Sequence, residues 1–285
     1  MSFNPSSPEP IQPLSLGNVV SAGLRLYRSH LKSYLQLSSL AYAWALIPVY
    51  GWAKCAAILA LISRLAFAEL VNQPESIQDA KRIVNSRMWQ FFVMGLLMFL
   101  ITIGLTIAVM IPSGIVFGII AAYATLGAAN GTPNPAAILL LGLLVLVFIP
   151  LLFVMLLWMQ ARFLVVELPL AIEDGVDGSS TIGRSWNLTK GSVWRIVGII
   201  LVAYLITLPI QLPFTLLSQF IQIAFVSSAQ DNPSYALLSS IISLIVSLIG
   251  AVLVVPFWQA IKAVIYYDLR NRREGFGLKL RDREV

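Results

Sequence analysis

The sequence has very few side chains that hold metals or form disulfides. It contains a single cysteine, Cys55, and a single histidine, His30, among 285 residues. One cysteine cannot form an intrachain disulfide, and no CxxC motif or Cys/His cluster is available to bind a metal. We therefore predict no metal and no cofactor. We interpret Cys55 as a small apolar packing residue and His30 as a solvated residue near the basic face of the first short helix.

Charged residues are scarce as well, at 11% against 58% hydrophobic residues. Uncharged runs over 88–111, 136–160 and 236–260 exceed the roughly 18 residues that cross a hydrocarbon core of about 30 Å. The composition predicts an all-α integral membrane protein. The opening MSFNPSSPEPIQP is polar and proline-rich, so we expect no cleavable signal peptide and a disordered tail over 1–14.

Weak internal repetition is visible in three segments that each end in a carboxylate followed by leucine. These are RLAFAEL (64–70), RFLVVEL (162–168) and AVIYYDL (263–269). Three other segments, which carry an early arginine and a further basic residue, precede the apolar runs that begin at Tyr34, Trp89 and Trp194. The pattern predicts three units of a short surface helix, a helix going out, a helix coming back and a carboxylate.

The units cover about 15–70, 72–168 and 176–269, within one membrane domain over 15–269 that is followed by a basic tail over 270–285. The short helix of the first unit has apolar and basic faces, so we expect it to lie flat on the membrane with its apolar side down. The second short helix is predicted to begin with a capping box of Asn72 and Glu75, and the third to end at Gly191.

The distribution of cations predicts the topology. All of the 19 basic residues except Lys54 fall before, between or after the predicted hairpins, whereas the connections NGTPNPA and SSAQDNPS carry none. This favours six transmembrane helices with both termini cytoplasmic and Lys54 near the outer headgroups. The uncharged stretches 113–129 and 214–229 follow Pro112 and Pro213. We predict that they form re-entrant or interfacial helices on the outer side, because a crossing would invert every later basic loop.

Two short blocks give the sequence a family resemblance. RSWNLTKGSVWRIVG and the terminal YYDLRNRREGFGLKL resemble the membrane domain attached to some glycerophosphodiester phosphodiesterases, and related stand-alone bacterial multipass proteins, notably cyanobacterial ones. The resemblance covers about residues 15–280 and implies a bacterial plasma membrane or a thylakoid membrane. In the fused relatives a separate barrel with a His-Arg-Gly motif does the chemistry. Because His30 is followed by Leu31 and Lys32, that activity is not carried over.

Three carboxylates at equivalent places of the units, Glu69, Glu167 and Asp268, are the candidate functional residues. They could converge to bind a cation or carry protons, or each could form a structural ion pair at a helix end. Arg25, Arg82 and Arg184 are the candidate partners for such pairs. A further set of residues is expected to contact lipid headgroups: Arg270, Arg272, Arg273, Lys279, Trp89, Trp194, Tyr266 and Tyr267.

Two functions remain open at this stage. The first is a non-enzymatic membrane protein whose basic cytoplasmic face binds anionic lipid or a membrane-protein partner and organises the bilayer. The second is a transporter or channel for a lipid or small solute that uses the three carboxylates and proline-broken helices. The net charge of +6 does not indicate a nucleic-acid partner, because the predicted topology already accounts for the basic residues. The sequence does not set the oligomeric state.

Overall fold

The computed structural model describes residues 15–126 and 134–275, and within these ranges all regular secondary structure is helical. The all-α prediction is therefore confirmed for the described part of the chain. The expected disordered tail over 1–14 lies outside the described residues, as does most of the predicted basic tail, Lys279 included.

A short helix followed by two longer helices occurs three times along the described chain, which is the order of elements that the sequence pattern predicted. A further short helix, α7, separates the second group from the third. The helices are α1 (Leu16–Ser29), α2 (Leu31–Ala45), α3 (Tyr50–Leu70), α4 (Ile77–Ser86), α5 (Met88–Leu126), α6 (Pro135–Phe163), α7 (Glu167–Ile172), α8 (Ser180–Thr189), α9 (Val193–Asp231) and α10 (Pro233–Glu274).

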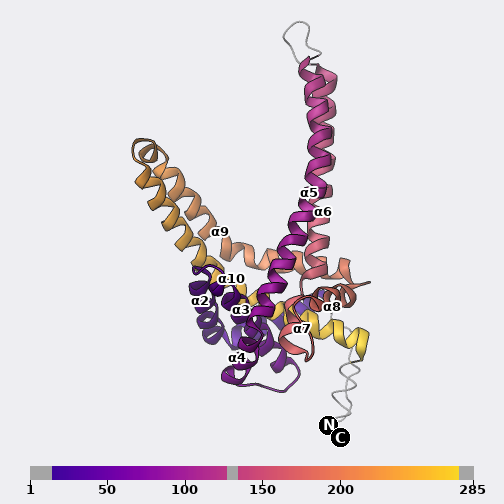
Figure 1. Cartoon of the computed structure of the whole chain (residues 1–285), viewed down its shortest axis with the longest axis vertical. Helices are drawn as coiled ribbons and strands as arrows, with labels where there is room; N and C mark the ends of the chain where they lie inside the picture. The colour runs from indigo at the N-terminus through magenta and orange to yellow at the C-terminus, as the bar shows by residue number, and fades with distance from the viewer. Residues whose placement is uncertain (1–14, 127–133, 276–285) are drawn as a thin grey trace, which may run out of the picture.

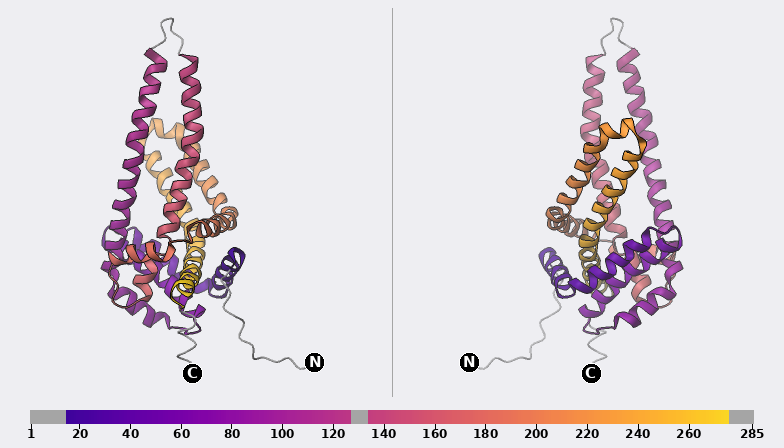
Figure 2. Two further views of the ribbon diagram at one scale, coloured as in Figure 1. Left: turned by 90° about the vertical axis from the view of Figure 1, so that its right-hand side faces the viewer. Right: turned by 90° about the vertical axis from the view of Figure 1, so that its left-hand side faces the viewer.

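Two helical hairpins, α5–α6 and α9–α10, project from a helical base and diverge from one another (Figures 1 and 2). The base contains α1–α4, α7 and α8 together with the starts of α5 and α9 and the ends of α6 and α10 (Figure 1). Four segments in the described chain are long and apolar enough to cross a membrane: Met88–Ala124, Pro135–Ile172, Val193–Phe225 and Ser234–Glu274. Four spans, rather than six, are therefore supported by length and composition.

Each long helix is buried in the base and exposed beyond it. In α10, the side chains from Phe257 to Leu269 are largely buried, whereas those between Tyr235 and Ile249 are largely exposed. The part of α10 outside the base is about 20 residues long, which corresponds to about 30 Å of helix, the thickness of a hydrocarbon core. The length of α10, 42 residues, therefore suffices for one membrane crossing plus a continuation into the base.

The prolines inside the long helices do not divide them. Residues 113–126 belong to α5 and residues 214–231 to α9, so the expectation of separate interfacial helices after Pro112 and Pro213 is wrong. Proline is tolerated in apolar helices where hydroxyl groups and neighbouring helices compensate for the lost hydrogen bond. Next to Pro112, the Ser113 hydroxyl donates a hydrogen bond to the carbonyl of Val109 at 2.8 Å.

Small polar residues hold α9 and α10 together outside the base. The hydroxyls of Ser218 and Ser243 each donate to the other residue's carbonyl, and the hydroxyls of Ser218 and Ser247 lie 3.1 Å apart. A Cβ added at Gly250 would lie 3.1 Å from the Phe214 side chain. Small residues and interhelical hydroxyl bonds replace the hydrophobic effect as the cause of packing where helices are surrounded by lipid.

The apolar face of α1 packs on α10 and is not free to face lipid. Val19, Val20 and Leu26 are buried, and the Tyr27 hydroxyl donates to the carbonyl of Leu253 at 2.9 Å. The expectation that α1 lies apolar side down on the membrane is therefore wrong. Helical periodicity identifies a face that must be covered, but it does not distinguish a lipid surface from another helix.

Adding a methyl group at Gly23 tests the contact between α1 and α10. The new Cβ would lie 2.7 Å from Ile261 Cγ1 and 3.3 Å from its Cα, so the two helices must separate. We expect Gly23→Ala to lower the free energy of unfolding by about 1 kcal/mol, because overpacking outweighs the better helix propensity of alanine. Gly17→Ala, in the same helix with nothing within 4 Å, should leave stability unchanged or slightly higher in thermal unfolding in detergent. Equal effects would contradict the packing.

Candidate functional site

Four charged side chains of the base, two carboxylates and two guanidinium groups, form a closed ring of alternating sign. Glu173, just after α7, accepts a hydrogen bond from Arg184 of α8 at 2.8 Å, and Arg184 also pairs with Glu274 at 2.5 Å. Arg270 closes the ring, 3.1 Å from Glu274 and 3.9 Å from Glu173. Hydrogen bonding to Glu173 is the main reason why the pKa of Arg184 is raised above its ordinary value. The ring ties α7 and α8 to the end of α10.

Tyr266 packs beneath this ring, away from any lipid. Its side chain is fully buried, and its hydroxyl donates to Glu173 at 2.5 Å. The guanidinium of Arg270 lies 5.8 Å from the centre of the Tyr266 ring. The prediction that Tyr266 and Arg270 contact lipid headgroups is therefore wrong for Tyr266 and does not describe Arg270, whose side chain is only 17% exposed. Tyr267 is half-buried and packs against Phe67.

The three carboxylates at equivalent places of the units each contact a different partner. Glu69 Oε2 lies 3.0 Å from His30 Nε2, and Glu167 lies 3.1 Å from Lys262. Asp268, with a side chain only 5% exposed, pairs with Arg195 at 2.5 Å and with Arg272 at 2.9 Å. Among the described residues, no group of three or more His, Cys, Asp or Glu side chains could hold a metal ion. Each carboxylate thus has its own partner, which is a histidine for Glu69 and a lysine or arginine for Glu167 and Asp268.

The cations that pair with these carboxylates differ from those predicted. Arg184 pairs with Glu173 and Glu274 and with none of the three carboxylates, while Arg25 and Arg82 are exposed and form no ion pair within the described part of the chain. Lys262 was missed because its partner, Glu167, is 95 residues away in the sequence. His30 was read as solvated, yet its contact with Glu69 joins the start of α2 to the end of α3.

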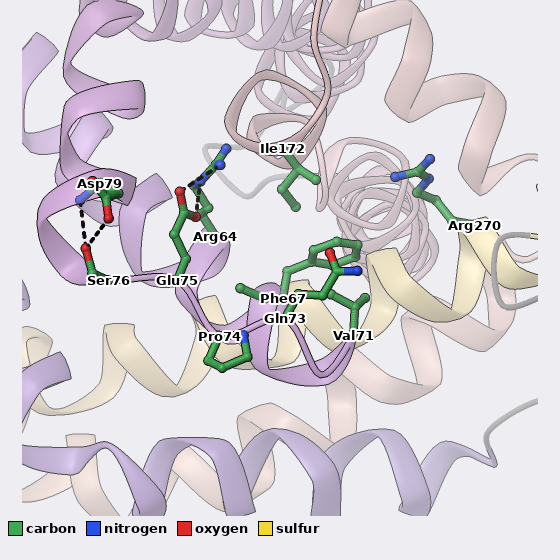
Figure 3. A pocket seen from close by; sticks show the side chains of 11 residues that line it. Arg64, Phe67, Val71, Gln73, Pro74, Glu75, Ser76, Asp79, Ile172 and Arg270 are labelled. Carbon is green, nitrogen blue, oxygen red and sulfur yellow. Dashed lines mark hydrogen bonds and ion pairs between the residues drawn. The ribbon is translucent and has the colours of Figure 1, made fainter. Parts of the chain in front are cut away.

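A cleft of about 580 Å³ opens between the end of α3, the segment leading into α4, the end of α7 and α10 (Figure 3). Arg64 forms a forked ion pair with Glu75 on one side of it, and Arg270 lies on the other. Apolar side chains, among them Phe67 and Ile172, complete the lining. None of Glu69, Glu167 and Asp268 lines this cleft.

Helix α4, which borders the cleft, begins differently from the prediction. The N-cap of α4 is Ser76, whose hydroxyl oxygen accepts a hydrogen bond from the Asp79 N–H at 3.1 Å. The predicted capping box of Asn72 and Glu75 is wrong, because Glu75 is used by Arg64. Gly191 is confirmed in its predicted place after α8, with a φ of 80° that favours glycine.

The remaining residues expected at lipid headgroups divide into two groups. Trp89 and Trp194, at the starts of α5 and α9, are 53% and 67% exposed, as an interfacial position requires. Arg272 pairs with Asp268 on the same helix, and Arg273 donates to the carbonyl of Lys190, which ties the end of α10 to the segment after α8. The predicted tail therefore begins as an extension of α10, which ends at Glu274.

Lys54 lies at the same end of the molecule as the other described cations. Its Nζ donates to Asn85 Oδ1 at 3.0 Å, next to the junction between α4 and α5. The prediction sets Lys54 apart from the other cations, whereas the structure places it with them, beside the start of α5. The cause is that α2 and α3 were read as a spanning hairpin, whereas their turn lies beside the beginning of α5.

The described carboxylates of the base all have interaction partners, whereas several exposed cations form no ion pair with a described residue. Among side chains that the structure describes, the Asp79 carboxylate accepts from the Ser76 hydroxyl and the Asp177 carboxylate accepts from the Ser180 N–H. Glu69 contacts His30, and the other carboxylates pair with lysine or arginine. Hydrogen bonds led by the Ser180 N–H lower the pKa of Asp177 to about 2, so it stays ionised at neutral pH. The exposed cations without an ion pair among the described residues are Arg25, Arg28, Lys32, Lys81, Arg82 and Lys190.

Comparison with known proteins gives a family but no characterised relative. No curated protein and no solved structure matches the chain. A family described as a domain of unknown function, DUF7847, matches residues 76–269. The match runs from the N-cap of α4 to the residue after Asp268, so it covers the second and third helix groups and leaves out α1–α3. It does not link the chain to glycerophosphodiester phosphodiesterase membrane domains, and that resemblance stays a prediction. Because the match spans well over half of the sequence, the chain belongs to the DUF7847 family.

Proposed function

We propose that this protein is a non-enzymatic multipass membrane protein whose base lies on the cytoplasmic side and binds anionic lipid, thereby organising the bilayer around it. The observation that carries the proposal is the surplus of exposed cations. Arg25, Arg28 and Lys32 lie along α1 and the start of α2, and Lys81 and Arg82 lie on α4. No carboxylate of the described chain forms an ion pair with any of them.

The charge of the base and the position of the long helices support the same placement. Loops rich in Lys and Arg remain on the cytoplasmic side of a membrane, and anionic lipids give that leaflet a negative surface potential. Each basic residue close to such a surface contributes about 1 kcal/mol of attraction. The first described helix, α1, and the end of α10 both lie in the base (Figure 1), and we place both termini on the cytoplasmic side in this proposal. A bacterial plasma membrane or thylakoid membrane has the required anionic lipids.

Neutralising the surplus cations is expected to remove the preference for anionic lipid. We would replace Arg25, Arg28, Lys32, Lys81 and Arg82 with glutamine and reconstitute the protein in mixed phosphatidylcholine and brominated phosphatidylglycerol. Quenching of the most exposed tryptophans, Trp52, Trp89 and Trp194, reports lipid contact. The wild-type protein should be quenched more than the bulk lipid ratio predicts. The variant should lose at least fivefold of that preference, in the direction that 0.5 M salt also produces.

The control keeps the charge and changes only the side-chain shape. Arg25→Lys, Arg28→Lys and Arg82→Lys combined should retain the preference, because attraction to a charged surface depends on charge more than on geometry. Equal quenching of the wild-type protein and the glutamine variant would contradict the proposal. Loss of quenching in both the lysine and the glutamine variants would point to a protein partner or a folding defect instead.

The alternative proposal, transport of a lipid or small solute, predicts a different result. It requires at least one of Glu69, Glu167 and Asp268 to exchange its partner for a solute or a proton. Their individual ion pairs favour a structural role. Flux through reconstituted vesicles, abolished by Glu167→Gln in a protein that remains folded, would reverse this preference.

A further inference from the structure

The hairpin of α2 and α3 lies in the base and runs across it toward the beginning of α5 (Figure 2). Two contacts fix its relation to α4. Near one end of α3, Arg64 pairs with Glu75, just before α4, and near the other end Lys54 donates to Asn85 in the last turn of α4. The polar helix α4 therefore runs back along α3 between these two contacts.

This arrangement is incompatible with a membrane crossing by α3. If residues 54–64 of α3 lay in the hydrocarbon core, α4 would lie there as well, with the exposed side chains of Lys81 and Arg82. A charged side chain at the centre of the bilayer costs about 2.5–3.5 kcal/mol even on the lowest scale. The two projecting hairpins impose no such cost, because their described apolar parts carry no charged side chain beyond the base.

The turn between α2 and α3 is an exposed apolar tip with a fixed shape. Its side chains are about half exposed or more: Leu46 (64%), Ile47 (48%), Val49 (49%) and Trp52 (54%). The Trp52 indole N–H donates to the carbonyl of Ala45 at 3.1 Å. Val49 has a φ of 60°, which a β-branched residue rarely adopts, and a Cβ at Gly51 would lie 2.0 Å from the carbonyl oxygen of Trp44. The turn thus holds its apolar side chains outward at a cost in backbone strain.

The tip continues the apolar surface at which α5 leaves the base. The ring of Tyr50 lies 6.4 Å from the ring of Trp89, and Trp89 and Val93 are 53% and 46% exposed on the first turns of α5. Tryptophan at the start of a spanning helix marks the interface between headgroups and acyl chains. The apolar tip therefore lies at that depth, beside the point where α5 enters the membrane.

We infer that the α2–α3 hairpin is a single-leaflet wedge: residues 46–52 insert among the acyl chains of the leaflet that faces the base, and the hairpin returns without crossing. Its partner is the lipid of that leaflet, recognised through apolar side chains. Insertion into one leaflet expands that leaflet relative to the other, so the wedge gives the proposed organisation of the bilayer a physical cause. The inference requires membrane insertion of the long helices, but it does not depend on a preference for anionic lipid.

Single cysteines at the tip test the inference in intact membranes. In a Cys55→Ala background, Leu46→Cys and Trp52→Cys place a thiol at the tip. Ser179→Cys reports the side of the base, and Ala136→Cys the far end of α6. Each position is labelled with a membrane-impermeant maleimide in sealed vesicles of both orientations. In a second experiment, the tip thiols of the purified protein are labelled with an environment-sensitive fluorophore. The labelled protein is then reconstituted into vesicles of phosphatidylcholine and nitroxide-labelled phosphatidylcholine, without anionic lipid.

We expect the tip positions to react only from the compartment that labels Ser179→Cys, and more slowly than Ser179→Cys. Their fluorophores should be quenched more by a nitroxide at carbon 5 than by one at carbon 16. Labelling from the compartment of Ala136→Cys would overturn the inference, because the hairpin would then cross. Fast labelling without quenching would also overturn it, because the tip would be in water. Neither result tests the preference for anionic lipid, because the fluorophore experiment uses vesicles that contain no anionic lipid.

Discussion

Asp268→Asn is expected to lower the free energy of unfolding by about 3 kcal/mol, the largest effect of any single substitution considered for this protein. The side chain of Asp268 is 5% exposed and lies between Arg195 of α9 and Arg272 of α10. Asparagine has nearly the same shape but no charge, so two guanidinium groups would lose their anion in a site that water reaches poorly. Unfolding by denaturant in detergent micelles would measure the change.

The matched control removes the more exposed of the two partners. Arg272 is 33% exposed and four residues from Asp268 on the same helix, a geometry that contributes about 0.3–0.5 kcal/mol. Arg272→Gln should therefore cost far less than Asp268→Asn, because Arg195 still neutralises the carboxylate. Similar costs for the two substitutions would show that the pair between α9 and α10 does not stabilise the base.

Glu173→Gln is expected to lower the free energy of unfolding by about 2 kcal/mol. Glu173 is 16% exposed and accepts hydrogen bonds from both Arg184 and Tyr266. Glutamine can still accept from Tyr266, but it removes one negative charge from a ring in which two carboxylates balance two guanidinium groups. Glu274 would then remain as the single anion between Arg184 and Arg270.

The neighbouring residue provides the control for Glu173. Asp174 pairs with Arg87, but its side chain is 99% exposed, and exposed ion pairs contribute about 0–1 kcal/mol. Asp174→Asn removes the same charge one position along the chain and should leave the melting temperature nearly unchanged. A cost equal to that of Glu173→Gln would indicate a general effect of net charge and would contradict the role of the ring.

The long apolar helices could be predicted because hydrophobic length and scarcity of charge are local properties. The same is true of the order of short and long helices and of the glycine that follows α8. The repeated pattern predicts the three carboxylates at helix ends, which is confirmed for Glu69 in the last turn of α3. Glu167 instead begins α7, and Asp268 lies within α10, which continues to Glu274. The partners of the three carboxylates were not predicted. Lys262 and Glu167 are 95 residues apart, and nothing in the local sequence indicates that Lys262, instead of one of the three predicted arginines, is the nearby cation.

The sequence by itself determined that the chain is helical, that its apolar segments are long enough to cross a bilayer and that its cations gather outside those segments, because each property follows from neighbouring residues. Only the tertiary structure decided which faces are covered by protein instead of lipid. The apolar side of α1 and the ring of Tyr266 lie against α10 and Phe67 respectively, although both patterns also suit a membrane surface. Burial against a helix and burial in lipid both remove apolar surface from water, so hydropathy cannot separate them.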